Sequence, residues 1–326
     1  MKRIRSAALA AVLGLVSISA AHAAIESPIH RNFNVRPGGT IIIDADVGDI
    51  KVTSGAANAS IDVVRVAKTS SRSHADEIFK DFDVTFAQEG NDVRIRSRYN
   101  HPTSWFHWNL DFDVHYVVNI PSQYNVDLTT AGGDITVSDL AGQVRVKTSG
   151  GDISLGRIGG VVDAHTSGGD VSMAGSHANA MLSTSGGDIK VGDAGGSLNV
   201  KTSGGSIDVR HAGADLKAHT SGGSIEIGDA GGAIDASSSG GSIRARLSRQ
   251  PHADSTLSTS GGGITVSVAP NMALDIDAHT SGGDVVSDVP VTILGKQHDS
   301  SLNGKLNGGG PKLVLRSSGG DIRIRK

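Results

Sequence analysis

The chain has 326 residues, 44 glycines, no cysteine and a formal charge of −3. The missing cysteines exclude disulfides, thiolate metal sites and cysteine nucleophiles. Only 3% of the residues are aromatic, all eleven of them lie before residue 125, and 38 of the glycines follow that residue. The C-terminal part therefore cannot build a thick globular core, because aromatic rings normally supply much of the buried area. Irregular glycine spacing excludes collagen, and recurring Ile, Val and Leu exclude a plain flexible linker.

The N-terminal segment, residues 1–23, has the features of a secretory signal peptide. Lys2, Arg3 and Arg5 precede an apolar run over Ala7–Ala20, and Ala21-His22-Ala23 offers small residues for cleavage after Ala23. The run is shorter than the ~20 residues that a membrane-spanning helix needs, so a retained anchor is the weaker alternative. The remaining chain has 27 basic and 33 acidic residues, a formal charge of −6. This balance gives no basic footprint for nucleic acid.

One short motif recurs throughout residues 125–326. The segment Thr148-Ser149-Gly150-Gly151-Asp152-Ile153 returns at every eighteenth position through the middle of the chain, and the spacing lengthens to 21, 21 and 37 near the end. Self-similarity at a fixed period is typical of solenoid proteins. Ten copies are present, and their first residues are Thr130, Thr148, Thr166, Thr184, Thr202, Thr220, Ser238, Thr259, Thr280 and Ser317.

Each copy reads as two short strands joined by two glycine-rich turns. Leu198, Val200 and Thr202 alternate with polar residues, and Ile207 and Val209 do the same after Gly204-Gly205. Residues spaced by two share one face of a strand, so these positions should face a thin core. Such a unit cannot stand alone, and stacking the copies as coils buries them against one another. We therefore predict an all-β, single-stranded β-solenoid (β-helix) with 18-residue coils; an antiparallel meander is the alternative.

The paired glycines are predicted to sit where each coil reverses direction. We expect them to adopt positive φ and to leave no room for a Cβ atom. The threonine that precedes them by two residues is predicted to point inward.

Residues 24–124 differ from the repeats. Thr40–Val52 already resembles one coil, whereas residues 61–120 predict strands at Ile61–Ala67, Val84–Phe86, Val93–Arg98 and Leu110–Ile120. A short helix is predicted over His74–Asp81, with Ser73 as its N-cap. We interpret this part as a small α+β cap on one end of the solenoid. The expected organisation is a signal peptide at 1–23, a first coil and cap at 24–124, and the solenoid at 125–326.

The repeated Ser-Gly-Gly-Asp-Ile-x-Val units resemble the bacterial "putative adhesin" β-strand-repeat family, a domain-of-unknown-function group. The Val117–Pro121 strand and the Asn307–Pro311 run before the last coil fit the same family, and the resemblance spans residues 35–326. It implies an exported β-solenoid of the cell envelope. It carries no catalytic residues.

Two polar columns run along the repeats. Asp134, Asp152, Asp170 and Asp188 occupy one position in successive coils, and Ser206, Ser224 and Ser242 continue it. Stacked carboxylates could hold Ca²⁺, or each side chain could bond the backbone of its turn. The second column is a row of serines beside the glycine pairs. Its hydroxyls either are structural or form a glycan- or ice-binding ladder; they belong to Ser149, Ser167, Ser185, Ser203, Ser221, Ser239, Ser260, Ser281 and Ser318.

The sequence contains no signature of catalysis. His165 and His219 are three coils apart, roughly 14 Å at the spacing of strands, which is too far to share a metal ion. His101, His107 and His115 have no recognised ligand spacing, and no nucleophile elbow is present. A polysaccharide-active β-helix enzyme is the main enzymatic alternative, but the repeats have no aromatic residue for sugar stacking.

One short segment concentrates aromatic side chains. The segment breaks strand alternation, so Trp105 and Phe106 cannot both face one core. Its residues are Trp105, Phe106, His107 and Trp108. The segment is either an exposed binding tip or a loop that folds back into the N-terminal core.

These observations together predict a non-enzymatic, exported, adhesin-like scaffold in the periplasm or on the cell surface. The expected partner is an envelope protein, a glycan or a second copy of the chain. We expect the protein to bind no nucleic acid, cofactor or metal and to have no transmembrane helix. An envelope-stress or signalling accessory protein is the other alternative.

Overall fold

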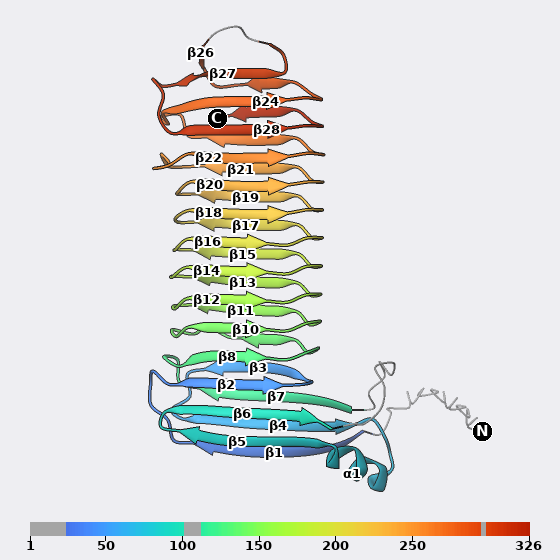
Figure 1. Cartoon of the computed structure of the whole chain (residues 1–326). Coiled ribbons are helices and arrows are strands. Elements are labelled where there is room, and N and C mark those ends of the chain that lie inside the picture. Colours follow the sequence, from blue (N-terminus) through green and yellow to red (C-terminus); the bar gives the residue numbers. More distant parts are fainter. Residues whose placement is uncertain (1–23, 101–111, 295–297) are drawn as a thin grey trace, which may run out of the picture.

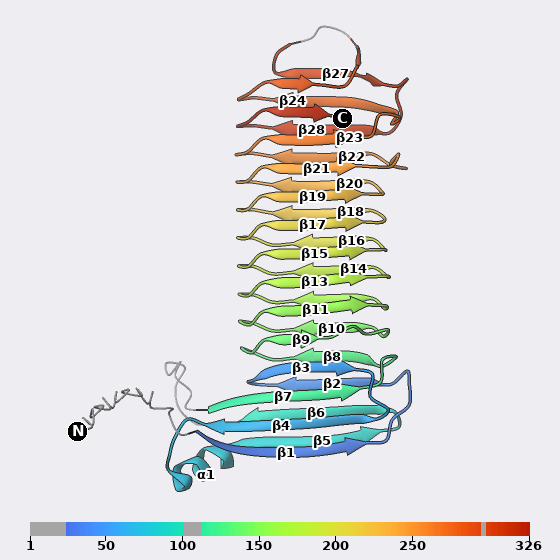
Figure 2. The same ribbon diagram turned by 180° about the vertical axis from the view of Figure 1, so that it is seen from behind.

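The computed structural model describes residues 24–100, 112–294 and 298–326. The predicted signal peptide and the Trp105–Trp108 segment lie outside these residues. The described chain is a rod of stacked coils (Figures 1 and 2) in which each regular coil gives one strand to each of two sheets.

The first sheet, sheet A, has 14 strands among the described residues. In spatial order they are β1 (Ile25–Phe33), β4 (Ala59–Ala67), β7 (Phe112–Ile120), β3 (Asp49–Ser54), β9 (Ile135–Val137), β11 (Ile153–Ile158), β13 (Val171–Ser176), β15 (Ile189–Ala194), β17 (Ile207–Ala212), β19 (Ile225–Ala230), β21 (Ile243–Leu247), β23 (Ile264–Val268), β29 (Ile322–Arg325) and β25 (Val285–Ser287).

The second sheet, sheet B, has 15 described strands. From the N-terminal end of the rod they are β5 (Phe82–Glu89), β6 (Asp92–Tyr99), β2 (Thr40–Ala45), β8 (Asn125–Thr129), β10 (Val144–Lys147), β12 (Val162–His165), β14 (Ala180–Ser183), β16 (Leu198–Lys201), β18 (Leu216–Thr220), β20 (Ile234–Ser238), β22 (Ser255–Thr259), β28 (Lys312–Ser317), β24 (Leu274–Thr280), β27 (Ser301–Leu306) and β26 (Thr292–Ile293).

The repeats pair in parallel, and each residue lies opposite its equivalent in the next copy, as the sequence predicts. Val144 lies opposite Val162, and Val162 lies opposite Ala180. Equivalent residues of successive coils therefore stack directly, which confirms the solenoid and shows that the antiparallel meander is wrong for the repeats.

The core is a thin layer of aliphatic side chains between the two sheets. In one coil Leu198 and Val200 from sheet B and Ile207 and Val209 from sheet A are all at most 2% exposed. Burying a side chain of this size contributes about 1.5–3 kcal/mol relative to leaving it in water. A coil thus has four such residues, and it depends on both neighbouring coils to cover them.

The glycine pairs are required by close packing rather than by positive φ. A Cβ atom built on Gly205 would lie 2.1 Å from the carbonyl oxygen of Gly187 in the preceding coil. Among the described glycines only Gly38, Gly48, Gly55, Gly90, Gly308 and Gly309 have positive φ. The expected lack of room is confirmed, whereas the expected positive φ in the repeats is wrong, because the coil turns with ordinary backbone angles.

The N-terminal part continues the two sheets of the solenoid. Strand β2 lies between β6 and β8, and β3 lies between β7 and β9, so the first coil is enclosed by residues from later in the chain. Beyond them β5 pairs antiparallel with β6, and β4 and β1 extend sheet A in the same way. The strands predicted within residues 61–120 are present, but they do not form a sheet of their own, so both sheets run across the expected boundary at residue 124.

A single described helix, α1 (Arg72–Lys80), lies at the N-terminal end of the rod (Figure 1). It begins two residues before the predicted start, and its N-cap is Ser71 rather than Ser73 because the Ser71 hydroxyl accepts from the backbone N–H of His74. Ala75 and Phe79 are its buried residues.

At the other end the coils do not follow chain order. Strands β28 and β29, the last two of the chain, insert between the coil of β22 and β23 and the coil of β24 and β25. The chain reaches this position through β27, which pairs antiparallel with β24, and through a turn at Asn307, Gly308 and Gly309, all with positive φ. The sequence spacing of 37 before the last copy marks this rearrangement without revealing it.

Candidate binding surfaces

The inward threonines form a ladder of hydrogen bonds along one edge of the rod. The Thr202 hydroxyl donates to the carbonyl oxygen of Gly187, 2.8 Å away in the preceding coil, and accepts from the backbone N–H of Gly205 at 3.3 Å. Thr202 is 2% exposed, and the same two bonds recur in most coils. The column therefore fastens each coil to the previous one and is not available to a ligand.

The aspartate column has a similar structural role. One carboxylate oxygen of Asp152 accepts from the backbone N–H of Asp170 at 2.8 Å, and Asp170 accepts from Asp188 at 2.7 Å. Ser206 and Ser224 make the corresponding bond in the coils where serine replaces aspartate. Across the described residues no three His, Asp or Glu side chains converge closely enough to hold a metal ion. Calcium binding by the aspartate column stays a prediction, and this geometry does not support it. The column consists of Asp134, Asp152, Asp170 and Asp188.

A second ladder, which the sequence did not reveal, lies at the opposite turns. Asn179 accepts from the backbone N–H of Ser197 at 2.9 Å, and Asp215 accepts from Ala233 at 3.0 Å. The Asn or Asp recurs in only some coils, so its periodicity is weak.

The serines beside the glycine pairs are exposed. Ser149, Ser167 and Ser185 each accept a backbone N–H bond through the carbonyl oxygen, from Gly168, Gly186 and Gly204 of the next coil. Their hydroxyls make no hydrogen bond with any described residue and therefore form an open polar row along one edge.

The histidines of the repeats bond to side chains of the next coil rather than to each other, and His211 lies 3.1 Å from a carboxylate oxygen of Asp229. His165 lies 2.8 Å from the Ser183 hydroxyl and His219 lies 2.7 Å from that of Ser237. In the N-terminal part, His115 lies 3.2 Å from a carboxylate oxygen of Asp49. His101 and His107 lie outside the described residues.

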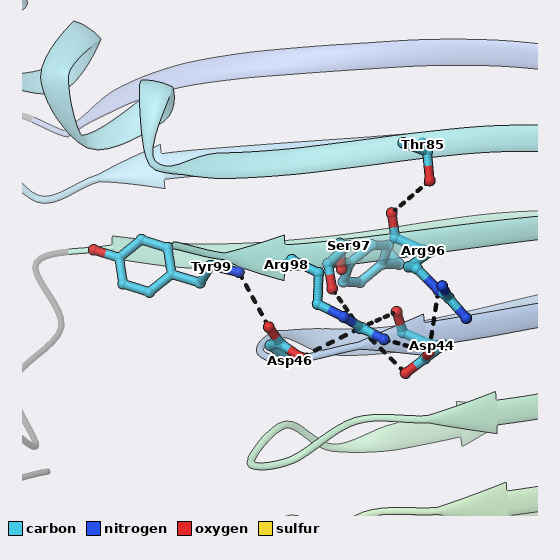
Figure 3. A network of polar contacts seen from close by, with 8 residues as sticks. Asp44, Asp46, Thr85, Arg96, Ser97, Arg98 and Tyr99 are labelled. Atoms are coloured by element: carbon cyan, nitrogen blue, oxygen red, sulfur yellow. Dashed lines mark hydrogen bonds and ion pairs between the residues drawn. The ribbon is translucent and has the colours of Figure 1, made fainter. Parts of the chain in front are cut away.

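A network of charged residues lies at the N-terminal end of sheet B (Figure 3). The guanidinium of Arg98 on β6 bonds the carboxylate of Asp44 on β2 at 2.5 Å and that of Asp46 at 3.2 Å. Arg96 lies 3.5 Å from the same Asp44 oxygen, so two arginines share one carboxylate. The hydrogen bond from Arg98 lowers the pKa of Asp44 below its usual value. The network joins the first coil to β6.

Behind this network the hydroxyl of Tyr116 on β7 bonds the hydroxyl of Ser97 on β6, linking sheet A to sheet B through the core. Both residues are fully buried, and burial raises the pKa of Tyr116 to about 12.

An aromatic cluster lies where the chain leaves and re-enters the described residues around 101–111. The ring of Phe112 stacks on Tyr99 with centroids 5.5 Å apart and also contacts Phe82 at 5.3 Å and Phe79 at 6.2 Å. Phe79, Phe82 and Phe112 are buried. Trp105, Phe106, His107 and Trp108, the predicted binding residues, lie in the segment outside the described residues.

A groove with a volume of about 490 Å³ lies on sheet B. Val161 and Met181, 48% and 50% exposed, give it an apolar floor, and Arg145, Asp163 and Lys217 are among its polar residues. No aromatic residue lines it. This groove therefore lacks the aromatic platforms expected of a polysaccharide-active enzyme.

These features define a two-sheet β-solenoid whose repeated side chains serve mainly to fasten one coil to the next. The family model described as Toastrack DUF4097 matches residues 38–245 and 214–325, so the chain belongs to this family, as its repeats suggest. No curated protein matches the sequence.

Three solved structures resemble the chain at low identity. A "putative adhesin" from Bacteroides fragilis is 12% identical, with a TM-score of 0.37, and 91% of this chain and 97% of that chain are covered. A "putative cell adhesion protein" from Clostridium sporogenes is 9% identical, with a TM-score of 0.21 and coverage of 92% and 99%. A "putative lipid binding protein" from Parabacteroides distasonis is 11% identical, with a TM-score of 0.26 and coverage of 92% and 97%. None of these names is an enzyme's.

We expect Asp44→Asn to lower the free energy of unfolding at neutral pH by about 1 kcal/mol or less, because the pair with Arg98 is partly exposed. The pKa of Asp44 is lower in the folded protein, so its stabilisation is present above the ordinary value of 3.8 and is lost as the pH falls through the folded value. Urea unfolding should show the difference at neutral pH, and the difference should shrink as the pH is lowered below 3.8.

Asp127→Asn is the matched control, because Asp127 lies on the neighbouring strand β8 and makes no ion pair with any described residue. A loss for Asp44→Asn that does not shrink in acid would contradict the assigned ion pair.

Proposed function

We propose that the protein is a non-enzymatic scaffold of the cell envelope that presents binding surfaces on a stiff rod. One observation carries this proposal: the side chains of the threonine column and of the aspartate column, including the serines that replace aspartate there, bond to the backbone of adjacent coils. Such side chains would be the acids and nucleophiles of an enzyme, but here they hold the stack together. The proposal stands on this geometry, and the names of the solved structures carry no part of it.

Export is part of the proposal. The features of residues 1–23 support a cleaved signal peptide and a place in the periplasm or at the cell surface. None of the helical residues that the structure describes forms a segment with the length and apolarity of a membrane span. Fractionation of cells that express the full chain should recover a product that starts at Ala24 in the envelope or the medium. An unprocessed cytoplasmic product would contradict export.

The adhesin-like role requires a partner, which we propose to be an envelope protein or a glycan. Trp105, Phe106, His107 and Trp108 are our proposed contact residues, since clustered aromatics are the side chains that most often dominate binding energy. A small α+β cap at the N-terminal end and self-association of rods also remain proposals.

We expect Trp105→Ala combined with Trp108→Ala to reduce recovery of the envelope partner in pull-downs by about tenfold or more. The melting temperature should not change, because the proposal places both rings at the surface. Met181→Ala is the control, since it removes an exposed apolar side chain elsewhere on the rod. A large fall in melting temperature would show instead that the tryptophans belong to the core.

A further inference from the structure

Four arginines form a regular array on the outer face of sheet A near the C-terminal end of the rod. Arg244 on β21 aligns with Thr265 on β23, and Thr265 aligns with Arg323 on β29. The same arrangement recurs two residues further along the strands, where Arg246 aligns with Ser267 and Ser267 aligns with Arg325. We call Arg244, Arg246, Arg323 and Arg325 the arginine patch. Its backbone positions are about 7 Å apart along a strand and about 10 Å apart across β23.

The guanidinium groups of the patch are open to a ligand. All four arginines are exposed. In the described residues Arg244, Arg246 and Arg325 make no ion pair or side-chain hydrogen bond, and Arg323 has one weak pair with Asp321 at 3.4 Å. The hydroxyls of Thr265 and Ser267 between them also lack a described partner. Elsewhere the arginines are often neutralised: Arg98 pairs with Asp44, Arg210 with Asp193, and Arg316 with Asp277.

The out-of-order coil creates this array. Arg244 and Arg323 are far apart in the sequence, and stacking in chain order would place β25 beside β23. Val286 of β25 instead lies on the far side of Arg323. The insertion of β29 places Arg323 and Arg325 on one side of β23, and β21 already has Arg244 and Arg246 on the other side. The hydroxyls of β23 therefore lie between two pairs of arginines.

We propose that the arginine patch binds an acidic polysaccharide, which deepens the proposed function and rests on it. Guanidinium groups pair with carboxylate or sulfate in a fixed two-bond geometry, and hydroxyls between them can bond sugar oxygens. Residues 125–326 contain no Phe, Tyr or Trp, and the arginine patch and its neighbouring hydroxyls offer no ring on which a neutral sugar or an unpaired base could stack. Recognition here depends on charge, which favours an anionic glycan.

The surrounding charges favour a linear polymer over a membrane. Glu226 on β19 aligns with Arg244, and Asp208 on β17 aligns with Glu226, so exposed carboxylates flank the patch on the same face. An anionic membrane lying flat on this face would meet these carboxylates as well as the arginines. A polysaccharide chain can cross β21, β23 and β29 and avoid them.

The test measures binding of the full-length protein to polygalacturonate, with neutral dextran, phosphatidylglycerol vesicles and a single-stranded oligonucleotide as comparisons. Arg246→Glu combined with Arg325→Glu should weaken polygalacturonate binding by at least about tenfold, since charge-assisted bonds are replaced by repulsion. The matched control is Arg94→Glu with Arg157→Glu. Both of those residues are exposed, neither makes a side-chain ion pair with a described residue, and the net charge changes equally. Binding by the control should stay within about twofold, and melting curves should match for all three proteins. If the variant with both arginines changed to glutamate misfolds, the variant Arg246→Gln with Arg325→Gln is measured in its place.

Equal losses in both double variants, or no binding of polygalacturonate by the unaltered protein, would overturn the proposal. Vesicle or oligonucleotide binding that depends on the patch while polygalacturonate is ignored would overturn it in favour of those partners. The outcome is separable from the proposed function. Polygalacturonate binding that Arg246→Glu with Arg325→Glu leaves unchanged, in a protein that is exported and still recovers its envelope partner, refutes the patch alone. Patch-dependent glycan binding by a protein retained in the cytoplasm refutes the envelope role alone.

Discussion

Gly205→Ala is expected to destabilise the protein by about 3 kcal/mol or more. Its Cβ atom would lie 2.1 Å from the carbonyl oxygen and 2.4 Å from the carbonyl carbon of Gly187. Both atoms belong to the backbone of the adjacent coil, so no side chain can move aside, and the coils must separate at this corner. Separation would also lengthen the hydrogen bonds of the threonine ladder beside it. Thermal and chemical unfolding of the purified protein measure the effect.

Gly132→Ala provides the control, because Gly132 belongs to a glycine pair of the first repeat but has no atom within 4 Å of its Cβ position. It should change the free energy of unfolding by less than about 1 kcal/mol. Equal effects at the two positions would show that glycine is needed for flexibility rather than for the close approach of coils.

Thr202→Val is expected to cost about 1–3 kcal/mol, although valine has nearly the same shape as threonine. The substitution leaves the Gly187 carbonyl and the Gly205 N–H without the hydroxyl that each bonds at one edge of the core. An unpaired, partly buried polar group carries most of its desolvation penalty. The measurement is the same unfolding experiment, with circular dichroism to confirm that the strands are retained.

Thr202→Ser separates the hydroxyl from the methyl group. Serine already occupies the same position at Ser238 and Ser317, where it makes both bonds. The serine variant should therefore keep most of the stability that the valine variant loses. A serine variant as unstable as the valine variant would assign the role to packing of the methyl group.

The repeat made most of the solenoid predictable. Residues spaced by two around Leu198 and Ile207 identify the core face, and the 18-residue period predicts the register that the structure shows. These features follow from local chemistry, because strand alternation and coil length are properties of each repeat. For the glycine pairs the sequence predicts both a lack of space and positive φ, and only the lack of space is confirmed. The close approach of stacked backbones requires glycine there, and glycine by itself does not impose positive φ.

The site was less predictable. The Asp column suggested both calcium and a turn bond, and the structure shows bonds to the next coil instead of the residue's own turn. The sequence does not predict the arginine patch, because Arg244 and Arg323 belong to coils that are not consecutive in the chain.

The sequence by itself determined the coil: its length, its two strands, its inward residues and its tight glycine corners. Only the tertiary structure decided the order of coils at the two ends, where β2 and β3 are enclosed by later strands and β28 and β29 insert before β24 and β25. The physical reason is that every coil offers nearly the same pairing edges, so local sequence does not distinguish neighbours. The end strands and their turns select the order, and that order brings the four arginines together.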